Sequence, residues 1–270
     1  MIGIEQTMYE KYGDYSNETF SELYDYLPIY SQRDDISFYV EWANRINRDV
    51  LELGCGTGRV SIPIVYTGVN VIALDYSMPM LKKLESKLDQ EEWDISDRLS
   101  VIRGDMTNFR LNKKFSLIIL PFRPFQHLIS VDDQLNCLKS VRDHLTQDGY
   151  FIFDLFNPNP DRLLTPAYGS VVDVPRFEMA DGRMLTRTSR VLTSHWKEKW
   201  NEYEFLYEIE ELNGKIKKIT QKTSMRYFSV EELELLLDMA GLKIIELYGD
   251  FDSSPYEQNS PEEIYITGLK

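Results

Sequence analysis

Residues 50–60 of the chain read VLELGCGTGRV, and this stretch decides the fold. A short apolar run is followed at once by glycines at positions 54, 56 and 58, although glycine weakens both strands and helices. Glycines at such positions predict a loop that a ligand or another backbone approaches too closely for side chains. The helix expected next, over 58–67, would offer free main-chain amides to a ligand.

Strand and helix patterns alternate on both sides of this loop. Runs rich in Val, Ile and Phe predict buried strands, and apolar residues at helical spacing predict helices between them. The predicted strands are 49–53, 69–74, 99–103, 115–121 and 150–156, and the helices are 58–67, 77–90 and 130–145. A helix over 229–241 and strands near 242–249 and 263–268 complete the pattern. It predicts an α/β fold: a doubly wound, mostly parallel, seven-stranded Rossmann-like sheet.

After Pro158 the pattern changes to an alternation with period two. Residues 202–210 read EYEFLYEIE, which is typical of a half-exposed antiparallel strand. Asp181-Gly182 and Asn213-Gly214 supply two-residue hairpin turns. We therefore expect an N-terminal helical cap at 1–47, a ligand-binding domain at 48–159 and 227–270, and an antiparallel β insertion at 160–226 over the acceptor pocket.

The charge balance excludes several classes of partner. With 30 Lys and Arg against 44 Asp and Glu, the net charge is -14, which disfavours nucleic acid and anionic lipid. No apolar run reaches membrane-spanning length, and the first thirty residues have no secretory apolar core. Cys55 and Cys137 form no zinc or disulfide pattern. These observations predict a cytoplasmic protein, monomeric or homodimeric, without nucleic-acid or membrane partners.

Four segments in order resemble the class I methyltransferases that use S-adenosylmethionine. They are the E-x-G-x-G-x-G pattern at Glu52, VIALDYS ending the second strand, GDM after the third strand, and LIILPF in the fourth. A dinucleotide loop would carry glycine where Arg59 stands. The resemblance implies that Asp75 accepts hydrogen bonds from both ribose hydroxyls and that Asp105 receives the adenine amino group. The full set of cofactor-binding candidates is Tyr30, Arg33, Glu52, Gly54, Cys55, Gly56, Gly58, Asp75, Tyr76, Gly104, Asp105, Met106, Leu120 and Pro121.

The segment PFRPFQHL at 121–128 narrows the resemblance to small-molecule methyltransferases that act on amino sugars. It implies that His127 faces the acceptor as a base or orienting residue. Alternatively, His127 caps the next helix or is satisfied in the core. The candidates for acceptor binding are Tyr24, Phe122, Arg123, Phe125 and Gln126, and no metal is expected. Tyr24, Tyr30 and Arg33 would reach the cofactor or the acceptor, or else would only pack and pair locally.

The sequence thus predicts an S-adenosylmethionine-dependent methyltransferase acting on nitrogen, slightly favoured over oxygen, of a small-molecule acceptor by in-line displacement. Three alternatives stay open at this point. They are a nicotinamide-dependent oxidoreductase, a non-catalytic cofactor-binding scaffold of the same fold, and a methyltransferase whose acceptor is a protein side chain.

Overall fold

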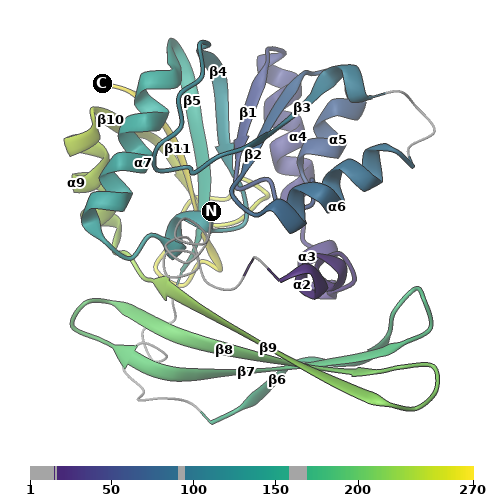
Figure 1. Cartoon of the computed structure of the whole chain (residues 1–270). Coiled ribbons are helices and arrows are strands. Elements are labelled where there is room, and N and C mark those ends of the chain that lie inside the picture. Colours follow the sequence, from purple (N-terminus) through teal and green to yellow (C-terminus); the bar gives the residue numbers. More distant parts are fainter. Residues whose placement is uncertain (1–14, 16, 91–94, 158–168) are drawn as a thin grey trace. The chain divides into compact units, whose positions relative to one another are not determined.

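The computed structural model describes residues 15, 17–90, 95–157 and 169–270 (Figure 1). The chain divides into two compact units after Arg33, after Asn157 and after Tyr227. The segments 34–157 and 228–270 form the sheet unit, and the described residues before 34 and from 169 to 227 form the insertion unit. Among the described residues, no helix is both long and apolar enough to cross a membrane.

The sheet unit is built on a seven-stranded, mostly parallel sheet, as the strand and helix alternation predicts. Its strands in chain order are β1 (Val50–Leu53), β2 (Val71–Asp75), β3 (Leu99–Arg103), β4 (Phe115–Leu120), β5 (Leu145–Phe156), β10 (Leu242–Tyr248) and β11 (Glu262–Leu269). Their order across the sheet is β10-β11-β5-β4-β1-β2-β3, in which β11 pairs antiparallel with both β5 and β10. The carboxyl ends of β1, β2, β4 and β5 therefore meet at one edge, where open α/β sheets bind ligands.

Helices cover both faces of this sheet, so successive strand residues enter different cores. One core cluster joins strand residues such as Val50 and Leu117 with side chains of α4 (Asp35–Ile46), α5 (Ser61–Tyr66) and α6 (Met78–Leu88). On strand β5, Phe151 and Phe153 stack on each other at 4.8 Å, and α7 (Val131–His144) packs against this strand and against α9 (Val230–Ala240). The apolar runs are buried for this reason.

Serine residues cap the starts of two of these helices, and a glycine ends one of them. The Ser130 and Ser229 hydroxyls accept hydrogen bonds from the amides of Asp133 and Glu232, at 3.1 and 3.4 Å, and cap α7 and α9. Gly241 ends α9 with a φ of 83°, a left-handed conformation that glycine adopts at little cost. Between β3 and β4 the described residues form no full helix.

The insertion unit contains the antiparallel sheet that the period-two pattern predicts. Its strands, in the order β6-β7-β8-β9, are β6 (Val171–Glu178), β7 (Met184–His195), β8 (Trp200–Glu210) and β9 (Ile216–Arg226). Gly182 and Gly214 have positive φ in the two predicted turns. Two short helices, α2 (Glu18–Tyr24) and α3 (Pro28–Ser31), belong to this unit, and Phe20 of α2 packs edge-on against Tyr207 at 5.0 Å.

Most observed elements differ from the predicted bounds by a few residues at an end, and two differences change the packing. Helix α4 lies within the predicted N-terminal cap 1–47, yet it packs in the sheet unit, because Phe38, Trp42 and Ala43 enter its core. Strand β5 begins at Leu145 rather than at residue 150, so that Leu145 pairs with Phe115 before a register shift.

Candidate active site

The loop after β1 is joined to the end of β2 by a hydrogen bond at the carboxyl edge. The Gly56 amide donates to Oδ2 of Asp75 at 2.8 Å, and the Ser77 amide donates to Oδ1 at 2.8 Å. Burial raises the pKa of Asp75, while these amide hydrogen bonds act in the opposite direction. A carboxylate has about four lone-pair sites, so two main-chain donors leave capacity for two hydroxyl donors of a ligand.

The three glycines of the loop have different surroundings, although all have positive φ. A Cβ added at Gly58 would lie 2.2 Å from Cδ1 of Leu84, and one at Gly54 would lie 3.1 Å from Cγ of Pro124. A Cβ at Gly56 would meet nothing within 4 Å. Packing within the protein therefore accounts for Gly54 and Gly58, and Gly56 is the position where a ligand can approach the backbone.

Glu52 supports the loop from inside the sheet unit. It is buried, and its carboxyl group accepts a short hydrogen bond from the Ser61 hydroxyl. Burial is the main cause that raises the pKa of Glu52 from 4.5 to about 8. Cys55 is also buried, and burial raises the pKa of its thiol well above the usual value, so it stays a neutral thiol rather than a nucleophile.

Arg59 has a partner that sequence reasoning did not find. Its guanidinium donates two hydrogen bonds of 2.6 Å to the carboxylate of Asp35, which is fully buried at the first turn of α4. The same guanidinium lies over the ring of Phe122, 5.2 Å from its centroid. Arg59 thus connects the glycine loop with α4 and with the segment after β4.

The segments after β2 and β3 place the other cofactor candidates. Oδ1 of Asp105 accepts hydrogen bonds of 2.8 Å from the amide and the hydroxyl of Thr107, which fixes the turn, and Met106 is buried. The Gly104 amide donates to the carbonyl of Asp75 at 2.9 Å. Tyr76 directly follows Asp75, and its carbonyl accepts a hydrogen bond of 3.1 Å from Nε of Arg103. The candidates Tyr76, Gly104, Asp105 and Met106 therefore follow β2 and β3 at the carboxyl edge of the sheet. Their contacts with the cofactor stay a prediction.

The segment after β4 turns sharply and then forms the short 3-10 helix η2 (Pro124–His127). Leu120 and Pro121 are buried at the end of β4. Phe122 and Arg123 both have left-handed φ, at 68° and 69°. His127, half-buried, is the last residue of η2, whose first residue, Pro124, packs beside Gly54 of the glycine loop.

Two acceptor candidates on η2 have structural contacts. Phe125 is fully buried, with ring centroids 5.6 Å from Phe153 and 5.4 Å from Phe228. Gln126 is also buried, and its Oε1 accepts a hydrogen bond of 2.8 Å from the Phe156 amide. The geometry gives both side chains a role in packing η2 on β5, and their assignment to acceptor binding stays a prediction.

Three further candidates lie in the insertion unit. Tyr24 stacks on Tyr30 at 4.6 Å, and the Tyr30 hydroxyl accepts a hydrogen bond of 2.6 Å from Arg187. The guanidinium of Arg187 is buried and also pairs with Asp173. Arg33 follows α3. The contacts of Tyr24 and Tyr30 match the local packing alternative, and all three assignments to cofactor or acceptor stay predictions.

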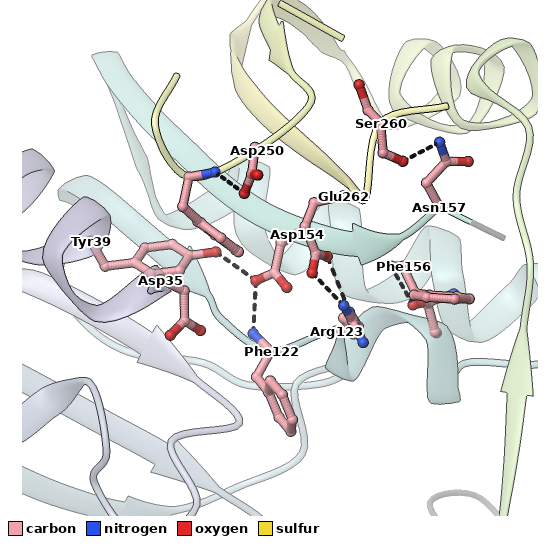
Figure 2. Close-up of polar contacts among 12 residues, drawn as sticks. Asp35, Tyr39, Phe122, Arg123, Asp154, Phe156, Asn157, Asp250, Ser260 and Glu262 are labelled. Carbon is pink, nitrogen blue, oxygen red and sulfur yellow. Dashed lines mark hydrogen bonds and ion pairs between the residues drawn. The ribbon is translucent and has the colours of Figure 1, made fainter. Parts of the chain in front are cut away.

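A second polar cluster at the carboxyl edge escaped sequence reasoning (Figure 2). Asp154 lies inside β5 and is fully buried. Its Oδ1 accepts hydrogen bonds of 2.7 Å from the Tyr39 hydroxyl and from the Phe122 amide. Glu262 of β11 pairs with Arg123. A carboxylate within an otherwise apolar strand, FIFDLF, was the available signal for Asp154.

Comparison with known proteins relates the sheet unit to methyltransferases. Residues 50–149, from β1 into β5, match the methyltransferase domain family. A curated relative, the cypemycin N-terminal methyltransferase of a Streptomyces species, is 23% identical over 220 residues, which make up 81% of this chain and 82% of that protein. The domain match agrees with the methyl-donor interpretation of the glycine loop.

Solved structures share the fold over nearly the whole chain. The CcbJ methyltransferase from Streptomyces caelestis has a TM-score of 0.77 and 23% identity, covering 94% of this chain and 97% of that one. An amino pentose methyltransferase from Micromonospora echinaspora, solved with S-adenosylmethionine bound, has a TM-score of 0.65 and 20% identity, covering 89% of this chain and 93% of that one. At these identities the likeness shows the Rossmann-like fold.

Because Gly56 and Gly58 have different surroundings, we expect alanine at Gly58 to affect mainly the stability of the protein and alanine at Gly56 to affect mainly ligand binding. Gly58→Ala should lower the free energy of unfolding by about 2–5 kcal/mol, because backbone strain at a φ of 80° adds to the collision of its methyl group with Leu84. Gly56→Ala should cost only about 1–2 kcal/mol of backbone strain but should weaken binding of S-adenosylhomocysteine strongly. Urea unfolding and calorimetry measure the two quantities. Tight binding by Gly56→Ala would contradict the assignment of Gly56 to the ligand.

The raised pKa of Glu52 predicts a dependence of stability on pH. The folded protein holds a proton that the unfolded chain releases between pH 4.5 and about 8, so the contribution of Glu52 is full below this window and is lost as the pH rises through it. The free energy of unfolding of Glu52→Gln minus that of the wild type should therefore increase as the pH rises, by at most about 1.4 kcal/mol per pH unit. Urea unfolding across the window measures it. Glu85→Gln, at an exposed position of α6, is the control, and a pH-independent difference for Glu52→Gln would contradict the prediction.

Proposed function

We propose that this chain, whose residues 50–149 form an S-adenosylmethionine-dependent methyltransferase domain, transfers a methyl group to a nitrogen atom of a small-molecule acceptor. The observation that carries the proposal is the hydrogen bond between the Gly56 amide and the buried Asp75 carboxylate, with open space beside Gly56. This arrangement combines a backbone that a ligand can approach with a carboxylate that accepts hydroxyl donors.

The residues of the carboxyl edge fit the cofactor. Asp75 would hold the two ribose hydroxyls, because its carboxylate keeps acceptor capacity beyond the Gly56 and Ser77 amides. Asp105, fixed by Thr107, would accept the adenine amino group. Glu52 would hold the loop in place through the hydrogen bond that its carboxyl group accepts from the Ser61 hydroxyl. A carboxylate rather than a basic side chain at the end of β2 suits a ribose that carries no phosphate.

The bound cofactor supplies a methyl group on a sulfonium, which a nucleophile can attack directly. The bond between the acceptor nitrogen and the methyl carbon forms as the bond between sulfur and that carbon breaks, and the electron pair stays on sulfur. The acceptor amine must be neutral to attack, and the product ammonium then loses its proton to solvent or to a base. The protein contributes alignment and exclusion of water.

His127 is the proposed acceptor-orienting residue or base. It ends η2, and the first residue of this helix, Pro124, packs beside Gly54 of the loop that would hold the cofactor. A half-buried histidine on this element can accept a proton from an amine or orient its lone pair. Phe122 and Arg123, which precede η2, are the further candidates for acceptor contact.

Nitrogen is favoured as the acceptor atom by the relatives. The curated relative is named as an N-terminal methyltransferase, and the solved neighbour as an amino pentose methyltransferase. We therefore infer a small amine, such as an amino sugar, as the acceptor class. An acceptor oxygen and a protein amine are the alternatives, and the assignment of the β insertion to the cover of the acceptor pocket stays a prediction.

A screen of acceptors tests this function directly. The full chain is incubated with S-adenosylmethionine labelled in the methyl group and with panels of small amines, hydroxyl compounds and amine-bearing peptides. We expect label in a small amine, with transfer that depends on the chain. Label only in a hydroxyl compound would replace nitrogen by oxygen, label only in peptides would make the acceptor a protein, and transfer to none would favour a non-catalytic scaffold.

Asp75→Asn should weaken binding of S-adenosylhomocysteine by about 10- to 100-fold, because hydrogen bonds to a charged group contribute about 1.5–3 kcal/mol. Isothermal titration calorimetry measures the affinity. Asp89→Asn, an exposed carboxylate at the end of α6, makes the same change in net charge and should bind as the wild type does. Equal affinities for Asp75→Asn and Asp89→Asn would refute the ribose assignment.

His127→Asn should lower kcat for the amine found in the screen by about 100-fold, the lower range for loss of a positioned acid or base. The affinity for S-adenosylhomocysteine should not change, because His127 lies outside the glycine loop. His195→Asn in the insertion sheet, where His195 stacks on Trp200 at 3.6 Å, is the control and should keep its rate. An undiminished rate for His127→Asn would assign His127 a structural role.

A further inference from the structure

The turn between β4 and η2 contains two successive residues in a conformation that bulky side chains rarely adopt. Phe122 has a φ of 68° and Arg123 a φ of 69°. Only glycine enters the left-handed region without steric cost, and such residues persist where surrounding contacts hold them. Strain of this kind is concentrated at functional sites. Contacts within the sheet unit hold this turn in place.

The backbone of the turn is held by a buried carboxylate. Oδ1 of Asp154 accepts a hydrogen bond of 2.7 Å from the Phe122 amide and another of 2.7 Å from the Tyr39 hydroxyl (Figure 2). Asp154 and Tyr39 are both fully buried. Because a buried carboxylate without partners is costly, this shared acceptor fixes the position of the Phe122 amide relative to α4 and β5.

The side chain of Phe122 is held by Arg59, which forms an ion pair with Asp35 of the same helix. Arg59 lies over the Phe122 ring and donates two hydrogen bonds to the buried carboxylate of Asp35. Asp35 and Tyr39 are four residues apart on α4, so they share one face of that helix. One face of α4 therefore acts on Phe122 twice, through Arg59 and through Asp154.

Arg123 extends the restraint to η2. Its guanidinium pairs with Glu262 at the start of β11 and lies over the ring of Phe156, 4.9 Å from the centroid. Arg123 is also the residue before the first turn of η2. The conformation of the turn therefore sets the direction in which η2, and with it His127, leaves the sheet.

We propose that Tyr39 and Asp154 are positioning residues for methyl transfer, which together hold the strained Phe122–Arg123 turn through the Phe122 amide. The inference rests on the proposed function, in which His127 of η2 orients the acceptor. Neither residue needs to contact the cofactor or the acceptor. Their effect is on the alignment of the acceptor with the methyl group, on which in-line displacement depends.

The first test compares two buried tyrosine hydroxyls in the same unit. Tyr39→Phe removes the hydroxyl that donates to Asp154, and Tyr265→Phe removes the hydroxyl that donates at 2.7 Å to Glu263. Both side chains are fully buried, and Tyr265 stacks on Phe153. Tyr39→Phe should lower kcat about tenfold, since misplacement by about 1 Å can cost about 100-fold. Affinity for S-adenosylhomocysteine should be unchanged, and Tyr265→Phe should keep its kcat.

A second comparison uses the conservative variant. Asp154→Asn keeps an oxygen that accepts from the Phe122 amide, and Asp154→Ala removes it. We expect Asp154→Asn to keep most of the kcat that Asp154→Ala loses, when kcat is calculated per mole of folded protein. Equal loss of kcat in Tyr39→Phe and Tyr265→Phe, or no rescue by Asn relative to Ala, would overturn the positioning role.

Hydrogen exchange tests the turn without any acceptor. The Phe122 amide should exchange faster in Tyr39→Phe and in Asp154→Ala than in the wild type and in Tyr265→Phe. If the wild type transfers methyl to no compound, the proposed function fails while this readout still tests the restraint. Unchanged exchange at Phe122 in both variants would refute the inference even in an active enzyme.

Discussion

The hydrogen bond from the Gly56 amide to the Asp75 carboxylate is the contact on which the arrangement of the site depends. It joins the loop after β1 to the end of β2, two strands that are neighbours in the sheet. The same carboxylate accepts the Ser77 amide and so fixes the start of α6. Because α6 supplies Leu84, which fills the space beside Gly58, the loop is held from both sides.

Helix α4 links this loop to the segment that would face the acceptor. Asp35 binds Arg59 of the loop, and Tyr39 binds Asp154 of β5. Both connections end at Phe122, whose ring lies under Arg59 and whose amide donates to Asp154. Arg59, which follows the glycine loop, and Asp154 of β5 thereby hold one short turn. Methyl transfer from a sulfonium needs little covalent catalysis by a protein, so alignment of the reacting groups is the main contribution of the protein.

Local patterns predicted the strands and both hairpin turns, because these depend on residues close in sequence. Gly182 and Gly214 have positive φ in those turns. The extension of β5 back to Leu145 was missed, since pairing with Phe115 depends on a distant strand. The role of α4 was missed for the same reason: nothing in the sequence near Asp35 or Tyr39 points to Arg59 or Asp154.

The sequence by itself determined the Rossmann-like sheet, the methyl-donor motifs and the antiparallel insertion, because hydrophobic periodicity and glycine spacing are local signals. Only the tertiary structure decided what each residue of VLELGCGTGRV contacts. Gly54 and Gly58 make room for Pro124 and Leu84, and Gly56 alone of the three is open beyond its backbone. Arg59 binds Asp35 rather than serving only as a substitute for glycine. These partners lie far apart in the chain, and folding brings them together at the carboxyl edge of the sheet.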